Sequence, residues 1–452
     1  MSQVIHILGG GLAGLAAAIR LAKFGFKPVI IEKNHYLGGR VRSFTDQETG
    51  DEIDNGQHLI MANCTNLLQF LREIKNPDGF EIQKKFHIPF IRVASKGPQQ
   101  KELAIPALPY PLHLLASVPD RRFFSVRDKL ALFHLLKLKT VSPDEYFHKS
   151  ALEILIEFRQ TDSLIRDFWN PFLESALNSS IDQINGKLFI ILIKETLLRG
   201  GHYLKLGFPK EGLSRVLINP AEKILNQLRV TVIKKKLIKN ILFSKNNEAV
   251  SAVVDNEENE IPVETLISTV PQRNLIKIIP APVKTMLWGE DYDTFEYSPI
   301  ISIHLWTKTP ITHQPYLAFL NSKIHWLFNK RVYGGPLYSN YFVYQLTISN
   351  ATELATRAPL SLESDIKEEL KKLFPKFDIG DLVKMKIIKE KFATPVSNSF
   401  NEKRRLNYKA PVKNLFIAGD WSNTGLPYTM ESAILSGFRV ADEIISKRYF
   451  NT

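Results

Sequence analysis

Three glycines near the start of the chain have the spacing of a dinucleotide-binding turn. Residues 4–8 form a short apolar run that leads directly into Gly9, Gly11 and Gly14. In such a turn the first glycine permits a tight bend, the second lets the backbone approach a pyrophosphate, and the third lets the next helix pack on the strand. The backbone N–H groups at the start of that helix then face the phosphates. The pattern therefore predicts a bound nucleotide cofactor, the alternative being a glycine-rich turn without a ligand.

The residue after the second predicted strand narrows the choice of nucleotide. The pattern predicts a helix over 15–24, a turn at Gly25 and a strand over 28–31, followed at once by Glu32. A carboxylate at this position accepts hydrogen bonds from a ribose hydroxyl and repels a 2′-phosphate. The expected cofactor is therefore FAD or NAD rather than NADP.

A second glycine turn follows at residues 38–40. Gly38 and Gly39 allow the backbone to turn close to a ligand, and Arg40 can bind diphosphate oxygens unless it is simply a surface arginine. With its acidic residue followed by a Gly-Gly-Arg turn, this segment resembles the corresponding segment of the flavin amine oxidase and phytoene desaturase superfamily. The resemblance implies FAD as the cofactor.

The far end of the chain carries a matching piece. Residues 414–420 predict a strand that ends in Gly419 and Asp420, and a helix is expected over 432–447. A carboxylate there can accept hydrogen bonds from ribityl hydroxyls, and a helix that starts near Met430 can direct N–H groups at the flavin. The superfamily's Gly-Asp motif has this role; a structural cap at Asp420 is the alternative.

Two further stretches are similar to a narrower family. Asp-Asn-Gly-Gln-His-Leu at 54–59 and Gly-Asp-Trp-Ser-Asn-Thr-Gly-Leu-Pro at 419–427 resemble the hydroxysqualene dehydroxylases, formerly described as squalene-associated FAD-dependent desaturases. The same likeness extends to residues 169–172, 176–178 and 208–213. The chain departs from the family at Tyr428, Met430 and Ser432, where smaller residues are expected, and this leaves the fine substrate specificity open.

The resemblance implies a reduction, in which reduced FAD delivers hydride to hydroxysqualene as its hydroxyl leaves as water. Such a step needs a proton donor in a water-poor pocket. His58 is the candidate donor because it follows the Asn-Gly turn, although a hydrogen-bonded structural histidine is the alternative. Asp54 is a second candidate catalytic residue that can instead fix the turn or contact the cofactor. The expected cofactor-binding residues are Gly9, Gly11, Leu12, Ala13, Gly14, Glu32, Lys33, Gly38, Gly39, Arg40, Asn55, Gly56, Gln57, Gly419, Asp420, Tyr428, Thr429 and Met430.

Three other functions compete with this interpretation. A carotenoid or phytoene-type desaturase would run in the opposite redox direction, a flavin amine oxidase would oxidise a polar amine, and a scaffold would hold flavin only as a structural group. No cysteine lies in the C-terminal cofactor segment, so the FAD is expected to be non-covalent. The sequence has no second dinucleotide fingerprint, so it does not identify the external electron donor. We expect no metal ion.

The elements that position these residues predict an α/β fold, with a Rossmann-like FAD-binding domain assembled from both chain ends and an interleaved α+β substrate domain with a helical cap. Apolar spacing is helical from 127 to 204, and a helix is expected over 362–373. Strands are expected over 230–233, 237–243, 249–254 and 265–269 as a small meander, and over 300–306 and 341–348 in a second sheet. The predicted FAD-binding parts are 1–75, 205–280 and 401–452, and the substrate parts are 76–204 and 281–400.

Composition limits the surroundings in which the protein works. The chain has 452 residues, a net charge of +13 and one cysteine, Cys64, which excludes an intrachain disulfide and fits a reducing cytoplasm. No basic block is interleaved with aromatic residues, which argues against nucleic-acid binding.

The charge instead favours an anionic membrane surface. No apolar run reaches the ~18 residues that a spanning helix needs. Residues 103–119 are apolar but interrupted by prolines, so we expect a loop with at most a short helix. Arg121, Arg122, Arg127 and Lys129 follow it and can meet lipid headgroups. The prediction is a cytoplasmic protein that binds the inner face of the membrane peripherally and takes a C30 isoprenoid substrate.

Overall fold

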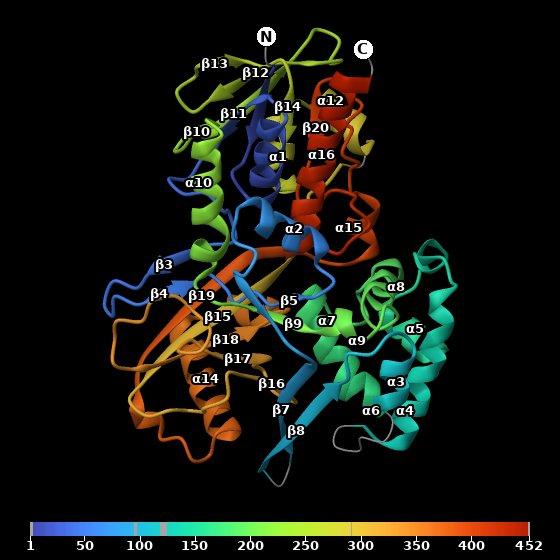
Figure 1. The fold of residues 1–452 in the computed structure, drawn as a ribbon, viewed down its shortest axis with the longest axis vertical. Helices are drawn as coiled ribbons and strands as arrows, with labels where there is room; N and C mark the ends of the chain where they lie inside the picture. The colour runs from blue at the N-terminus through green and yellow to red at the C-terminus, as the bar shows by residue number, and fades with distance from the viewer. Residues whose placement is uncertain (1–2, 95–96, 118–123, 291, 451–452) are drawn as a thin grey trace.

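A five-stranded parallel sheet forms the centre of the upper part of the molecule in Figure 1. The computed structural model describes residues 3–94, 97–117, 124–290 and 292–450. The sheet takes its strands from three separate parts of the chain, in the spatial order β10 (Thr231–Ile233), β2 (Lys27–Ile31), β1 (Val4–Leu8), β14 (Leu266–Ser268) and β20 (Leu415–Ile417). This is the parallel α/β arrangement that the sequence predicts.

Helices pack on this sheet through small residues. α1 (Leu12–Lys23) carries a run of fully buried alanines and lies against α16 (Met430–Phe450), and α10 (Asn219–Gln227), preceded by η4 (Ser214–Ile218), lies beside α1. A Cβ on Gly437 of α16 would lie 2.2 Å from the carbonyl oxygen of Ala13, so glycine is what lets these two helices touch. The first and last elements of the described chain therefore share one core.

The predicted meander is smaller than expected. Only β11 (Ile238–Phe243), β12 (Val250–Asp255) and β13 (Glu260–Pro262) pair in an antiparallel sheet, whereas β10 and β14 join the parallel sheet. Short apolar strands carry no local sign of which sheet they join, and here the hydrogen bonds to β1 and β2 decide. α11 (Gln272–Ile278) and α12 (Ala281–Trp288) complete this part.

A seven-stranded sheet lies below, at the lower left of Figure 1. Its order is β19 (Leu382–Pro395), β15 (Tyr297–Thr307), β18 (Phe342–Ile348), β17 (Trp326–Asn329), β16 (Tyr316–Leu320), β7 (Phe86–Ala94) and β8 (Gly97–Ile105). One face packs on α14 (Pro359–Leu373) through Leu362, Ile366 and Leu370. The other face is directed at the site described below. Small elements around it are β3 (Ser43–Thr45), β4 (Glu52–Asp54), β5 (Ile60–Met61), β6 (Phe80–Ile82), β9 (Leu206–Pro209), α2 (Thr65–Glu73), α13 (Thr352–Thr356), η5 (Ile379–Asp381) and α15 (Ser399–Lys403).

Helices form the lower right of the molecule, as the spacing over 127–204 predicts. They are α3 (Leu112–Ser117), α4 (Val126–Leu132), η1 (Phe133–Lys139), η2 (Pro143–Tyr146), α5 (Ala151–Glu157), α6 (Asp162–Leu164), η3 (Ile165–Trp169), α7 (Asn170–Leu177), α8 (Gly186–Glu195) and α9 (Gly201–Leu204). The apolar stretch over 103–119 is only partly a loop, because residues 103–105 pair with β7 in β8. Residues 118–123, with Arg121 and Arg122, lie outside the described part of the chain.

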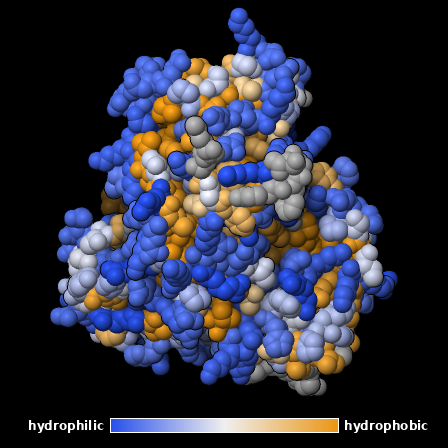
Figure 2. Space-filling view, turned by 45° about the horizontal axis from the view of Figure 1, so that its top comes forward, coloured by the Kyte–Doolittle hydropathy of each residue, from blue (hydrophilic) through white to orange (hydrophobic). Residues whose placement is uncertain are grey.

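Within the described residues, no helix combines the length and the apolar character needed to cross a bilayer. Figure 2 shows a largely hydrophilic surface, with hydrophobic residues gathered mainly on the upper part and in recesses between the upper and lower parts.

Candidate active site

The first glycine turn has the geometry that a bound diphosphate requires. Gly9 has φ +102°, and its N–H donates to the carbonyl oxygen of Ile31 at 2.9 Å. A Cβ on Gly14 would lie 2.1 Å from the Gly9 carbonyl oxygen, which makes this glycine a packing requirement. A Cβ on Gly11 would instead meet nothing within 4 Å. Gly11 therefore borders open space at the start of α1, where Leu12 and Ala13 begin the helix.

Glu32 closes the same turn from the end of β2. Its buried carboxylate accepts hydrogen bonds from the Gly10 N–H at 2.8 Å and from the Asn34 N–H at 2.9 Å, and Lys33 beside it is exposed. The second glycine pair lies over the first turn, because the Gly38 N–H donates to the Gly10 carbonyl oxygen at 2.8 Å. The two glycine motifs thus form one cradle.

Arg40 joins the two ends of the chain. Its guanidinium lies 2.6 Å from a carboxylate oxygen of Asp420 and donates to the carbonyl oxygen of Ala393 at 2.7 Å. Burial acts to lower the pKa of Arg40, but the charge and hydrogen bond of Asp420, with Tyr297 and Glu390, together raise it. Gly419, with φ +130°, is the bend that brings Asp420 to this position. Two roles stay predictions: Arg40 binds the diphosphate, and Asp420 binds ribityl hydroxyls.

Two tyrosine hydroxyls near Asp420 have no hydrogen-bond partner among the described residues. They belong to Tyr428 and Tyr297, and both are buried. Burial raises the pKa of Tyr297 to about 12, and the charge of Asp420 adds to this effect. α16 begins at Met430, directly after Thr429, so its N-terminal end adjoins these hydroxyls. Buried hydroxyls are rarely left unpaired, so the region around these two tyrosines is suited to a polar ligand that hydrogen-bonds them.

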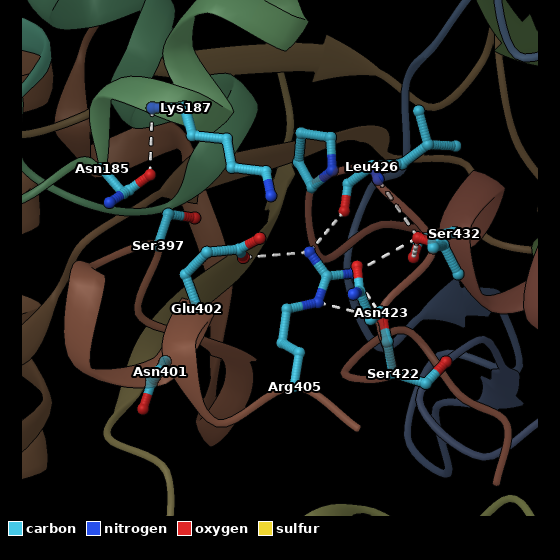
Figure 3. A network of polar contacts seen from close by, with 12 residues as sticks. Asn185, Lys187, Ser397, Asn401, Glu402, Arg405, Ser422, Asn423, Leu426 and Ser432 are labelled. Atoms are coloured by element: carbon cyan, nitrogen blue, oxygen red, sulfur yellow. Dashed lines mark hydrogen bonds and ion pairs between the residues drawn. The ribbon is translucent and has the colours of Figure 1, made fainter. Parts of the chain in front are cut away.

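A buried arginine that the sequence analysis did not single out fixes the C-terminal loop. Arg405 donates to the carbonyl oxygens of Ser422 at 2.9 Å and Leu426 at 2.7 Å, and it pairs with Glu402 at 3.1 Å (Figure 3). Both charged side chains are almost fully buried. Arg405 therefore holds residues 420–426 in the conformation that presents Asp420 to Arg40.

We expect Arg405→Met to loosen this loop and to weaken FAD binding. The change leaves Glu402 buried and unpaired, and breaking a buried pair in this way costs about 3–5 kcal/mol. Flavin fluorescence on dilution of the holoenzyme should show FAD dissociating at least about tenfold faster, since ~1.4 kcal/mol is a factor of ten. Lys403→Met, an exposed change two residues before Arg405, is the control. Unchanged FAD release in Arg405→Met would contradict the positioning role.

The stretch at 54–58 is anchored by a buried ion pair. One carboxylate oxygen of Asp54 lies 2.8 Å from Nζ of Lys330, and the other accepts from the Ser43 hydroxyl and the Leu213 N–H. Lys330 also donates to the side-chain oxygen of Gln57 at 3.3 Å. The charge of Lys330 lowers the pKa of Asp54 although burial opposes this. These contacts are those of a residue that holds the turn at 54–58 in place. A catalytic role of Asp54 stays a prediction.

Asn55, Gly56 and His58 lie between this anchor and the FAD-side elements. Asn55 reaches Glu390 at 3.5 Å, and the position of a Cβ on Gly56 is 3.3 Å from the Ser302 hydroxyl. His58 is half-buried, and burial lowers its pKa to about 4; Asp54 raises the pKa and Arg40 lowers it further. Its imidazole is therefore neutral near pH 7 and is electrostatically coupled to Arg40.

The buried histidines predict an acid-sensitive fold. Burial lowers the pKa of His58 and His325 to about 4 and that of His304 to about 3, whereas an unfolded histidine titrates near 6.5. Between these values the unfolded chain binds protons that the folded chain does not, so stability is full above pH ~6.5 and is lost as the pH falls toward 4. Thermal unfolding should show Tm falling between about pH 7 and 5.

A single substitution tests whether the buried histidines cause this dependence of Tm on pH. His304→Gln should flatten the dependence of Tm on pH, while His202→Gln, at an exposed histidine, should leave it unchanged. A Tm that does not vary over this range in the unaltered protein would show that these histidines bind protons in the folded chain as they do in the unfolded chain.

An apolar cavity lies between the seven-stranded sheet and the helices. It is partly open to solvent, and its walls include Phe86, Ile88, Leu103, Trp169, Phe172 and Trp326. The polar exceptions in the lining are Asp167, Ser175, Thr196 and His325. Trp169, Pro171 and Phe172 come from the stretch that the sequence analysis matched to the hydroxysqualene dehydroxylases. The cavity has the lining of a site for an apolar molecule.

Taken together, the cradle fits FAD. Open space at Gly11, an acidic residue at the end of β2, the Arg40–Asp420 pair and two unpartnered tyrosine hydroxyls come from both ends of the chain and converge. With the apolar cavity next to the sheet, they define an FAD-dependent oxidoreductase.

The chain belongs to the family of flavin containing amine oxidoreductases, whose model matches residues 12–445. Hydroxysqualene dehydroxylases of Sinorhizobium fredii and Rhodopseudomonas palustris are 29% and 27% identical to it, each over 99% of this chain and 99% of the relative. The 15-cis-phytoene desaturase of Synechococcus elongatus is 24% identical over 98% of this chain and 96% of its own length. These matches confirm the resemblance that the sequence motifs indicate.

Solved structures confirm the fold. An oxidoreductase from Methanosarcina mazei superposes with a TM-score of 0.70 at 16% identity, over 97% of this chain and 100% of that one. A putative protoporphyrinogen oxidase from Exiguobacterium gives the same TM-score at 14% identity, over 99% of both chains.

Proposed function

We propose that this protein reductively removes the hydroxyl group of hydroxysqualene to form squalene. The observation that carries the proposal is the apolar, aromatic-lined cavity between the seven-stranded sheet and the helices, together with full-length relatives named hydroxysqualene dehydroxylase. A C30 isoprenoid needs such a lining, because each buried methylene contributes about 0.8 kcal/mol to binding. The balanced reaction is R–OH + FADH2 → R–H + H2O + FAD, with reduced FAD supplying the hydride.

The residues of this chain have three tasks in the proposed reaction. The cavity walls exclude water, so a cation formed on loss of the hydroxyl meets hydride rather than solvent. The Asp54–Lys330 pair holds the turn that carries His58. His58 is the proposed proton donor for the departing hydroxyl. Because it is neutral near pH 7, it donates from its minor, protonated form, which Asp54 favours and which burial and Arg40 oppose.

An anaerobic assay tests the proposal. The holoenzyme, reduced with dithionite, is given hydroxysqualene, and we expect squalene to form as the flavin is oxidised. Desaturated polyenes from phytoene, or peroxide from an amine in air, would instead support the desaturase or the amine oxidase. Absence of squalene with fully reduced enzyme would overturn the proposal.

We also propose that the region of α3, α4 and η1 docks on an anionic membrane, from which the protein receives its substrate. Leu108, Leu112, Val126 and Leu130 are large hydrophobic residues with 37–58% of their surface exposed on or next to α3 and α4. Exposed Arg127, Lys137 and Lys139 lie on α4 and η1. His113, next to Leu112, contacts the carbonyl oxygen of Leu197 in the cavity wall, so the exposed group adjoins the cavity. Apolar side chains flanked by cations are what an interfacial segment presents to lipid.

Co-sedimentation with anionic liposomes tests the docking. A Leu112→Glu, Leu130→Glu variant should lose most of its liposome binding while retaining FAD. Leu360→Glu is the matched control, because Leu360 is 81% exposed on α14 in another part of the molecule. Equal sedimentation of the two variants would contradict the proposed docking surface.

A further inference from the structure

A row of polar side chains lies on the face of the seven-stranded sheet that is turned away from α14. It consists of Ser302 and His304 on β15 and of Gln345 and Thr347 on β18, and we call these four residues the polar row. Ser302 is directly opposite Thr347, and His304 is directly opposite Gln345. Directly opposed residues of antiparallel strands point to the same face, so all four side chains lie together.

The polar row lies between the FAD-side turn and the apolar cavity. On one side, Nε2 of His304 lies 3.0 Å from the carbonyl oxygen of Asp54, and Ser302 adjoins Gly56. On the other side, β17 places Trp326 opposite Thr347 and Phe328 opposite Gln345. Trp326 lines the cavity. Because neighbouring strands are ~4.8 Å apart, the row begins one strand away from the cavity wall.

Four polar atoms of this row have no partners within the described part of the protein, although Nε2 of His304 contacts Asp54. Both Nε2 and Oε1 of Gln345 are unpaired, as are Oγ1 of Thr347 and Nδ1 of His304. Gln345 and His304 are fully buried, and Thr347 is 9% exposed. Burying an unpaired amide is costly, and native structures keep very few such groups. The row is therefore built for a ligand that brings its own donor and acceptor.

We propose that Gln345, with Thr347 beside it, hydrogen-bonds the hydroxyl group of the substrate and so selects a hydroxylated isoprenoid over a hydrocarbon. The proposal rests on the function proposed above and adds the specificity-determining residues to it. A hydroxyl both donates and accepts, which matches the oxygen and the nitrogen of one amide. A hydrocarbon such as squalene leaves the amide unpaired, and sites built to bind a hydroxyl reject analogues without it.

Binding to the oxidised holoenzyme tests the proposal without turnover, since oxidised FAD has no hydride to give. Dissociation constants for hydroxysqualene and squalene are read from the perturbation of the flavin absorption spectrum. We expect the unaltered enzyme to bind hydroxysqualene at least about tenfold more tightly than squalene. Gln345→Leu should bring this ratio close to one, and the isosteric Thr347→Val should lower it by a few fold. Leu346→Met, on the same strand but the opposite face, is the matched control and should keep the ratio.

The outcomes separate this proposal from the proposed function. A Gln345→Leu enzyme that holds FAD and keeps the full preference for hydroxysqualene overturns the hydroxyl-binding role, whatever the reductive assay shows. Loss of FAD from both Gln345→Leu and Thr347→Val also overturns it, because the row then serves the cofactor. Failure of the unaltered enzyme to form squalene, with the binding preference intact, overturns the reaction and leaves the hydroxyl-binding site standing.

Discussion

Replacing Gly11 with valine is expected to abolish FAD binding while the apoprotein stays folded. Gly11 has φ −76°, which any residue adopts, and a Cβ there meets no protein atom within 4 Å. The added side chain therefore occupies only the space beside the start of α1 that the diphosphate needs. We expect FAD affinity to fall at least about a hundredfold, equal to ~2.8 kcal/mol. Flavin absorbance after purification and Tm of the apoprotein measure the two effects separately.

Gly14→Ala supplies the contrast. A Cβ at that position would lie 2.1 Å from the backbone oxygen of Gly9, so the change should lower the Tm of the apoprotein and the FAD content together. If Gly11→Val retained FAD with unaltered affinity, the diphosphate would have to lie elsewhere and the cradle described above would be wrong.

Lys330→Met, directly after β17 of the seven-stranded sheet, is expected to be strongly destabilising. It leaves the fully buried carboxylate of Asp54 without its cation, and removal of one partner of a buried pair costs about 3–5 kcal/mol. Denaturant unfolding of the holoenzyme should show this loss. Adding Asp54→Asn to Lys330→Met should recover part of the stability, because the neutral amide no longer needs a counter-charge.

An exposed pair provides the comparison. Lys372→Met removes a cation from Glu368 on the surface of α14, and surface pairs contribute only ~0–1 kcal/mol. Equal losses from Lys330→Met and Lys372→Met would mean that water reaches the Asp54 carboxylate.

The FAD cradle could be predicted from the sequence because its rules are local. Glycine spacing, the following helix and Glu32 lie within one βαβ unit, and Gly419 and Asp420 end one strand. Lys330 could not be predicted in the same way, because its partner Asp54 is 276 residues away. Arg405 could not be singled out either, because in the sequence a glutamate and an arginine three residues apart look like an ordinary surface pair, whereas the structure buries both.

The polar row had a visible signal that needed the fold to interpret it. Ser302 and His304 alternate with isoleucines, and Gln345 and Thr347 flank Leu346, so polar residues recur at every second position of two apolar strands. Only the register of β15 with β18 shows that the four side chains share one face. The pattern indicated strands correctly but carried no information about which side would meet a ligand.

The order in which the strands of the parallel sheet occur in the chain sets the time at which the enzyme can acquire its cofactor. A ribosome makes β1, α1 and the first glycine turn early, but β20, Asp420 and α16 follow all of the substrate-domain strands. Until those last residues emerge, Arg40 lacks its carboxylate and α1 lacks the helix against which its alanines pack. We therefore expect cofactor loading to be the closing step of synthesis, and a nascent chain stalled before β20 to fail to retain flavin.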